Sequence, residues 1–242
     1  MKTQGSGPVI CNPPLEEDCQ CAIATFSHCD CAPNTDPDSS FWSDAAPVFA
    51  SRDTHGEVVA GHRTEIRARW STDNLYFLFV CPYQELNLKP CAETAVETNG
   101  LWNWDVAEVF VGSDLGNIRR YKEFEVSPQG EWVDLDIDLD RENKEDGWVW
   151  KSGCEVTARV DAPRKVWFGF MRIPYSAVDD RPAAFGNRLR INFYRSQGPE
   201  PNCKEIAWRP THSATFHVPE SFGTLLLVNV RRENETACLK ES

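Results

Sequence analysis

The sequence has no long hydrophobic run and no excess of positive charge. Its longest apolar stretch, residues 75–80, falls far short of the roughly 20 apolar residues that a membrane-spanning helix needs. The chain carries 25 Lys and Arg against 37 Asp and Glu, which gives a net charge of −12. Nucleic-acid binding depends on a basic surface that contacts phosphates. We therefore expect neither a membrane span nor a nucleic-acid partner.

Common catalytic patterns are also missing. The sequence contains no His-Glu-x-x-His, no Gly-x-Ser-x-Gly and no glycine-rich phosphate-binding loop. Carboxylates are plentiful, but no pair stands out as the acid and base of a glycosidase. We therefore predict that the chain is not an enzyme, and a glycan-active enzyme is the alternative.

The first residues lack the apolar core of a secretory signal peptide. The ten cysteines leave two interpretations open. Either the chain is intracellular with free thiols, or it is secreted and a leader has been removed. Their density, about 4%, is below that of a disulfide scaffold, so the fold must depend mainly on a hydrophobic core.

Residues 1–40 are rich in Cys, Pro, Asp and Ser and show little periodicity, which predicts an irregular N-terminal arm. The arm contains two Cys-x-Cys pairs, formed by Cys19, Cys21, Cys29 and Cys31. Four thiolates can hold zinc tetrahedrally, although structural zinc sites usually have two to four residues between paired ligands. Disulfides to cysteines elsewhere in the chain and reduced thiols are the alternatives.

Residues 41–230 read as short strands separated by turns, and residues 231–242 as an acidic tail. Alternation of apolar and polar residues and short apolar runs predict these strands. Many short strands separated by turns are typical of a β-sandwich or barrel. Only residues 173–178 resemble a helical turn, with proline near its start. The predicted strands are 64–70, 75–81, 105–111, 121–126, 131–139, 154–161, 166–173, 188–195, 204–209 and 223–230. A turn signal at residues 71–74 predicts that the first two strands form a hairpin, and Ser-Pro-Gln-Gly at 127–130 favours a type I turn.

A row of aspartates lies on one face of the strand predicted at 131–139. Asp134, Asp136 and Asp138 alternate there with apolar residues, so successive carboxylates are about 6–7 Å apart. Leu139 occupies the place where a calcium EF-hand loop requires glycine, which excludes that motif. A different calcium site and a solvated outer sheet face remain the two interpretations.

Tryptophan and glutamate share a face at the start of the strand that follows residue 101. Trp102 and Glu108 are an even number of residues apart, so on an extended chain they point the same way. An aromatic plate beside a carboxylate suits a sugar, whose C–H face stacks on the ring while its hydroxyls bond to the charge. The alternative is that Trp104, Val106 and Phe110 pack in the core and Trp102 covers their edge.

Five segments carry a family resemblance when they are taken together. They are residues 101–110 (LWNWDVAEVF), 121–128 (YKEFEVSP), 171–174 (MRIP), 190–195 (RINFYR) and 216–223 (FHVPESFG). In this order they resemble the family 9 carbohydrate-binding modules, in the stand-alone family 9-like version. The resemblance covers about residues 40–228. It implies an antiparallel, jelly-roll-like β-sandwich related to DOMON domains, often with structural calcium and usually without catalysis.

The resemblance also implies a set of ligand contacts. Family members clamp a terminal sugar between aromatic residues, while Glu, Asn and Arg bond to its hydroxyls. Trp102 matches the first aromatic residue, Glu108 the carboxylate and Asn192 the amide. The second aromatic should follow Asn192 by about three residues, where this chain has Arg195. The sugar-contact residues expected here are Trp102, Glu108, Asn192, Arg195 and, as substitutes for the second aromatic, Tyr194 and Trp208.

Two functional hypotheses follow from these observations. The first is a non-catalytic domain that binds the terminal sugar of an oligo- or polysaccharide. The second is a structural or interaction sandwich that has lost its sugar, with the Cys-rich arm mediating attachment or metal binding. Family and cysteine content favour an extracellular or periplasmic location, and structural calcium is the cofactor expected.

Overall fold

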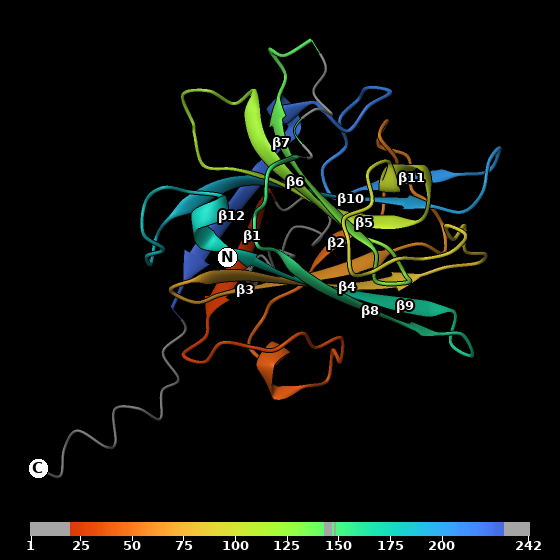
Figure 1. The fold of residues 1–242 in the computed structure, drawn as a ribbon, viewed down its shortest axis with the longest axis horizontal. Helices are drawn as coiled ribbons and strands as arrows, with labels where there is room; N and C mark the ends of the chain where they lie inside the picture. Colours follow the sequence, from red (N-terminus) through yellow and green to blue (C-terminus); the bar gives the residue numbers. More distant parts are fainter. Residues whose placement is uncertain (1–19, 143–146, 148, 230–242) are drawn as a thin grey trace, which may run out of the picture.

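The computed structural model describes residues 20–142, 147 and 149–229, whose strands form one twelve-stranded sheet folded over on itself (Figure 1). In sheet order, the main path consists of β7 (Trp132–Asp138), β6 (Arg120–Val126), β5 (Val106–Gly112), β10 (Arg188–Gln197), β12 (Gly223–Val228), β1 (Cys21–Phe26), β3 (Thr64–Trp70), β4 (Asn74–Pro82), β9 (Val166–Pro174) and β8 (Glu155–Asp161). Two further strands pair outside this path: β11 (Lys204–Ala207) with β10, and β2 (Val48–Ala50) with β3.

The folded sheet makes two layers that face each other. In Figure 1, β7, β6, β5 and β10 lie above β3, β4, β9 and β8. Phe77 and Phe79 on β4 meet Phe193 on β10, with ring centroids 5.7 and 6.1 Å apart. The prediction of an all-β sandwich is therefore confirmed. The helical elements are short 3₁₀ turns: η2 (Ser40–Trp42), η3 (Leu101–Asn103), η5 (Tyr175–Ala177) and η6 (Pro219–Ser221).

All ten predicted strands are present, with boundaries shifted by at most a few residues. The predicted hairpin of β3 and β4 pairs Trp70 with Leu75 next to its turn. The predicted turn at residues 127–130 is closed by a 3.0 Å hydrogen bond from the Gly130 amide to the Ser127 carbonyl. Gly130 has a φ of +85°, a conformation that glycine adopts without a steric penalty. Within the described residues, no helix is long and apolar enough to span a bilayer.

The prediction of an irregular N-terminal arm is wrong for residues 21–26, which form β1. This strand pairs in parallel with both β12 and β3 and so joins the two layers. Ala22 and Ala24 point into the main core and are completely buried. Small alanines carry little hydrophobic signal in the sequence, yet they suit a strand that other elements approach closely. The sandwich thus begins before the boundary expected at residue 40.

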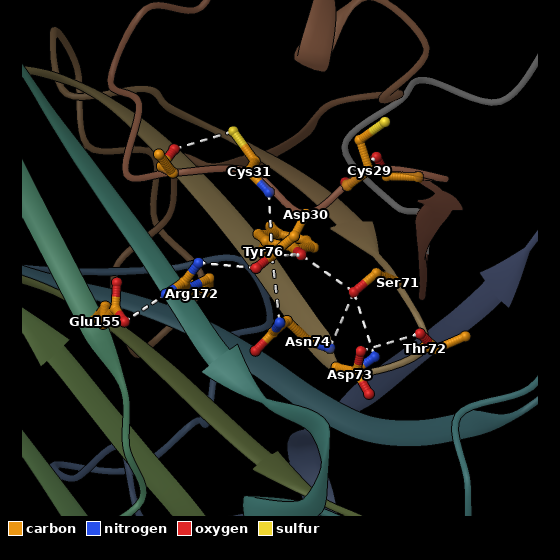
Figure 2. A network of polar contacts seen from close by, with 12 residues as sticks. Cys29, Asp30, Cys31, Ser71, Thr72, Asp73, Asn74, Tyr76, Glu155 and Arg172 are labelled. Carbon is orange, nitrogen blue, oxygen red and sulfur yellow. Dashed lines mark hydrogen bonds and ion pairs between the residues drawn. The ribbon is translucent and has the colours of Figure 1, made fainter.

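The segment after β1 packs against the outer face of the second layer. Trp42 is fully buried there with Tyr76, Leu78 and Phe170. Figure 2 shows Asp30 at the centre of a polar network on the same face. Its carboxylate accepts hydrogen bonds from the Tyr76 hydroxyl and from Arg172, whose guanidinium also contacts Glu155. Part of the predicted arm is therefore fixed to β4, β9 and β8.

The outer face of the first layer is buried as well. Along β5, Ala107, Val109 and Val111 join the main core between the layers. The alternate residues point outward, where Val106 and Phe110 join a second apolar cluster with residues of β6, β7, β10 and β11. Residues of η3 and of the loop before η6 pack over this second cluster. The first layer therefore has no fully solvated face in this region, and the candidate site lies on its outer side.

We predict that β1 is essential for the stability of the sandwich. Ala24→Asp should lower the free energy of unfolding by about 3 kcal/mol or more, because it buries an unpaired carboxylate in the core. Ile23→Asp is the matched control, since Ile23 is in the same strand but only partly buried. Urea denaturation followed by tryptophan fluorescence measures both. Equal losses for the two variants would mean that β1 does not pack in the core.

Candidate functional site

A cavity of about 230 Å³ lies on the outer face of the first layer. Its walls combine three aromatic rings, of Trp102, Phe110 and Phe216, with three carboxylates and two apolar residues of β7. A cavity of this size is below the range of about 300–1,000 Å³ typical of drug-sized ligands, so it suits a small molecule or a single ring. The lining residues are Trp102, Glu108, Phe110, Glu123, Leu135, Ile137, Ser196, Glu205, Ala214, Thr215, Phe216 and His217.

The structure brings Trp102 and Glu108 together at this cavity. Trp102 comes from η3 and is partly exposed, whereas Glu108 comes from β5 and is 2% exposed. On the neighbouring strands, Glu108 pairs in register with Tyr194 and Glu125. Val106 and Phe110 lie on the same face, as the sequence alternation indicated, and they form the apolar surroundings of the carboxylate. The Trp102 ring and the Glu108 carboxylate therefore line the same cavity.

Phe216 also lines the cavity with its aromatic ring, a position that was not expected from the sequence. Phe216 stacks on Tyr194, with ring centroids 4.2 Å apart and an angle of 13° between the planes. Tyr194 is only 1% exposed and does not line the cavity. Phe216 belongs to a segment of the family resemblance, but it lies in a loop more than 20 residues after Asn192. Spacing along β10 could therefore not reveal it.

Asn192 holds Tyr194, the residue on which Phe216 stacks, in position. Its side-chain amide donates hydrogen bonds to the Tyr194 hydroxyl at 2.6 Å and to the Arg209 carbonyl at 2.9 Å. Its side-chain oxygen accepts from the Arg209 amide at 3.1 Å. Because Asn192 is fully buried and engaged in this way, it fixes Tyr194 and the start of the loop that carries Phe216. It does not line the cavity.

Arg195 and Trp208 lie away from the cavity, contrary to the role expected from the sequence. Tyr194 and Ser196 face outward on β10, so strand alternation turns Arg195 toward the opposite face. Arg195 is fully buried, and its guanidinium donates to Thr64 at 3.1 Å and to Gln197. Trp208 is 4% exposed and packs against Phe193 in the main core. Both residues therefore serve the interior of the sandwich.

Three buried glutamates lie together at one side of the cavity: Glu108 and Glu123 line its floor, and Glu125 adjoins them without lining it. One carboxylate oxygen each of Glu108, Glu123 and Glu125 lies within 4.8 Å of the other two. Burial, followed by the charge of Glu123, raises the pKa of Glu108 well above its ordinary value. Burial, followed by the charge of Glu108, does the same for the pKa of Glu125. The floor therefore holds closely spaced carboxyl groups in an environment with little water, and their raised pKa values favour the protonated form wherever no cation compensates the charge.

His217 connects this floor to the loop before η6. Its Nδ1 lies 2.7 Å from the Tyr121 hydroxyl, and its Nε2 lies 3.9 Å from a carboxylate oxygen of Glu123. Burial and the nearby Glu123 carboxylate raise the pKa of Tyr121, so its hydroxyl keeps its proton at physiological pH. His217 and Phe216 are adjacent, so the loop supplies the cavity with an aromatic and an imidazole side chain.

The structure does not bring Asp134, Asp136 and Asp138 together as a cation site. Their side chains share one face of β7, but it is the face toward the main core and β8, at the edge of the sandwich. Asp136 forms an ion pair with Lys122 at 2.6 Å, and Asp138 forms one with Arg120 at 3.0 Å. Asp134 accepts a hydrogen bond from Ser152. Cross-strand cations thus compensate most of this charge.

The cysteines of the N-terminal region do not form a metal site within the described residues. There, the only group of three or more His, Cys, Asp and Glu side chains close enough to share an ion is the glutamate group. Cys21 is part of β1, and Cys29 and Cys31 lie in the segment that follows it. Cys19 lies outside the described residues. Every cysteine that the structure describes is a free thiol, so among these cysteines the structure corresponds to the alternative of reduced thiols and not to disulfides.

Solved structures with the same fold are carbohydrate-binding modules. A family 9 module from Caldicellulosiruptor kristjanssonii in complex with cellotriose matches with a TM-score of 0.61 and 12% identity, over 88% of this chain and 96% of that one. The same family from that organism in complex with glucose matches with a TM-score of 0.60 and 12% identity, over 88% and 98%. The chain has the fold of family 9 carbohydrate-binding modules.

Two further comparisons complete this picture. A candidate carbohydrate-binding protein from Bacteroides uniformis shares the family 9-like fold, with a TM-score of 0.65, 15% identity and coverage of 86% of this chain and 98% of that one. A curated protein of Arthroderma benhamiae named "Extracellular protein" is 24% identical over 169 residues, which is 64% of this chain and 70% of that protein. No protein-family model matches the chain.

We predict that Arg195 stabilises the fold through the buried carboxylate of Asp105. Burial raises the pKa of Asp105 to about 6, and backbone hydrogen bonds from Gly198 and Asn87 and then the Arg195 charge oppose that rise. Arg195→Met should cost about 3 kcal/mol of unfolding free energy, because it leaves Asp105 without its compensating charge. The double variant Arg195→Met with Asp105→Asn should lose less than the sum of the two single variants. Chemical denaturation of all three tests this, and strict additivity would contradict it.

Proposed function

We propose that this chain is a non-catalytic carbohydrate-binding domain that holds one terminal sugar ring in the cavity of the first layer. In this proposal the rings of Trp102 and Phe216 contact the apolar faces of the sugar, and Glu108 accepts hydrogen bonds from its hydroxyls. The observation that carries the proposal is a small cavity in which these two aromatic rings and a carboxylate meet, in a fold whose solved relatives bind cellotriose and glucose.

The arrangement of the carboxylates supports binding rather than hydrolysis. Glycosidases place an acid and a nucleophile or base around the scissile bond. Glu108 and Glu123 instead come from the adjacent strands β5 and β6 and lie together on one floor. A ring that rests on this floor meets both carboxylates from the same side. These two carboxylates can therefore orient hydroxyls from one side of the ring.

The location that fits this activity is extracellular. Oligo- and polysaccharides with free chain ends are abundant outside cells, and the relative from Arthroderma benhamiae is named for that location. The free thiols buried in the sandwich do not oppose it, since burial raises the pKa of Cys81 to about 12 and so makes its thiol unreactive. We accordingly propose secretion of the chain.

Removal of either aromatic ring should weaken sugar binding. Trp102→Ala and Phe216→Ala should each reduce affinity for cello-oligosaccharides or glucose by about 10- to 30-fold, because each removes a stacking surface worth about 1.5–2 kcal/mol. Trp104→Ala is the matched control, since Trp104 is two residues away, partly exposed and outside the cavity. Isothermal titration calorimetry with glucose, cellotriose and a panel of other oligosaccharides measures the affinities.

The same titrations decide between the two hypotheses for the sandwich. A wild-type chain that releases no heat with any oligosaccharide of the panel would favour a structural module without a sugar. An equal loss for Trp104→Ala would contradict the assignment of the cavity. Folding of each variant is checked by its unfolding midpoint before the titration.

A further inference from the structure

We propose that Glu108, Glu123 and Glu125 bind one calcium ion at the floor of the cavity. Calcium–oxygen bonds are about 2.3–2.6 Å long, so oxygens on opposite sides of one ion are about 5 Å apart. One oxygen from each of the three glutamates lies within 4.8 Å of the other two. The three carboxylates therefore fit into one coordination sphere without any rearrangement of the backbone.

The strand register explains why these side chains converge. Glu108 on β5 pairs directly with Glu125 on β6. Glu123 lies two residues earlier on β6 and so points to the same face. Like charges directly opposite each other destabilise a sheet. An ion between them converts this repulsion into attraction, and the regular pairing of the two strands holds the ligands in place.

Glu125 provides the strongest evidence that something else belongs at this position. It is 1% exposed, and within the described chain neither of its carboxylate oxygens accepts a hydrogen bond from an amide, a hydroxyl or a cationic side chain; its polar neighbour is another carboxyl group, that of Glu123. The described residues also provide no Lys or Arg ion pair to Glu108 or Glu125. A buried carboxylate without compensation is costly, and such groups usually coordinate a metal or share a proton.

Other buried carboxylates of this protein show how the fold usually compensates such a charge. Glu131 is fully buried, and it accepts a hydrogen bond from Ser127 and lies 3.5 Å from the Lys89 ammonium. Asp179 is 6% exposed and pairs with Arg181 at 2.7 Å. Asp105 and Asp134, which are also buried, accept hydrogen bonds from Gln197 and Ser152. Glu125 has neither an ion pair nor such a donor within the described residues, which supports a cation as its partner.

The ligand set selects the type of cation. Three carboxylates are hard oxygen ligands, which favour calcium or magnesium over softer metals. Calcium takes six to eight oxygens in flexible geometry, so water from the cavity completes its sphere beyond the glutamates. Magnesium demands near-ideal octahedral geometry, which three carboxylates fixed on two strands do not readily give. Glu108 and Glu123 line the cavity, whereas Glu125 lies behind them. The open coordination positions therefore face the cavity.

Calcium titration of the chelator-treated full chain tests the proposal without any sugar. Isothermal titration calorimetry at neutral pH should show one calcium per chain, and calcium should raise the unfolding midpoint, because a ligand that binds the folded state stabilises it. Glu125→Gln keeps the shape of the side chain and lies outside the cavity lining. We expect it to weaken calcium binding at least tenfold. It should still fold in chelator, since it removes an uncompensated charge.

Matched variants separate this site from the aspartate row on β7. Asp136→Asn removes a carboxylate on the neighbouring strand and should leave calcium affinity unchanged. Trp102→Ala should also keep its calcium, so a failure of sugar binding and a failure of calcium binding are distinguishable. Magnesium at the same concentration should bind more weakly than calcium.

Three outcomes would overturn the proposal. The first is a wild-type chain that shows neither heat nor a shift in unfolding midpoint with millimolar calcium, which would mean that the glutamates share protons instead. The second is calcium binding that survives in Glu125→Gln. The third is binding that disappears in Asp136→Asn, which would place the ion on β7. If Glu125→Gln does not fold, Glu123→Gln measured in the same titration replaces it.

Discussion

The structure depends on burial of both faces of the layer formed by β7, β6, β5 and β10. Its inner face packs against β4 and β9, where Phe77, Phe79 and Phe193 meet. Its outer face carries a second apolar cluster that includes Phe110 and Tyr121. An antiparallel sheet usually leaves one face to solvent. Here many of the outward-facing residues of these strands are also apolar, and η3 and the loop before η6 pack over them. The cavity lies between these segments and the sheet.

The loop that packs over the outer face, between β11 and η6, is held by side-chain hydrogen bonds where it begins and not by strand pairing. Asn192 is inserted into the outer face of β10 and binds both backbone groups of Arg209, where the loop toward η6 begins. Tyr194 lies beside it and receives Phe216 on its ring. Removal of water from the Asn192 amide is compensated because each of its polar atoms has a partner. The position of Phe216 is therefore determined by residues that no ligand needs to contact.

Local sequence patterns predicted the fold well, because strands and tight turns are specified by nearby residues. The alternation at 131–139, the proline and glycine at 127–130 and the apolar run at 75–80 were sufficient for that purpose. The site was predicted only in part. Trp102 and Glu108 were identified from their spacing and both line the cavity, although Trp102 lies in η3 and not on the strand that carries Glu108. Phe216 reaches the cavity from the loop between β11 and η6, which spacing along one strand does not reveal. β1 was missed because Ala22 and Ala24 carry little hydrophobic signal, and their burial depends on β12 and β3.

The assignment of the two sheet faces also shows why charge patterns alone mislead. The aspartates of β7 attract attention in the sequence because they follow one another at every second residue. Their partners Lys122 and Arg120 are separated from them by about 15 residues and become neighbours only through the pairing of β6 with β7. Glu108, Glu123 and Glu125 are less conspicuous in the sequence, since apolar residues surround them. That apolar setting excludes water, and the described residues provide no Lys or Arg ion pair to Glu108 or Glu125, so the smaller cluster carries the larger electrostatic demand. A cation or a polar ligand reaches these carboxylates through the cavity, which Glu108 and Glu123 line. The protonation and charge of the three glutamates therefore depend on what the cavity binds.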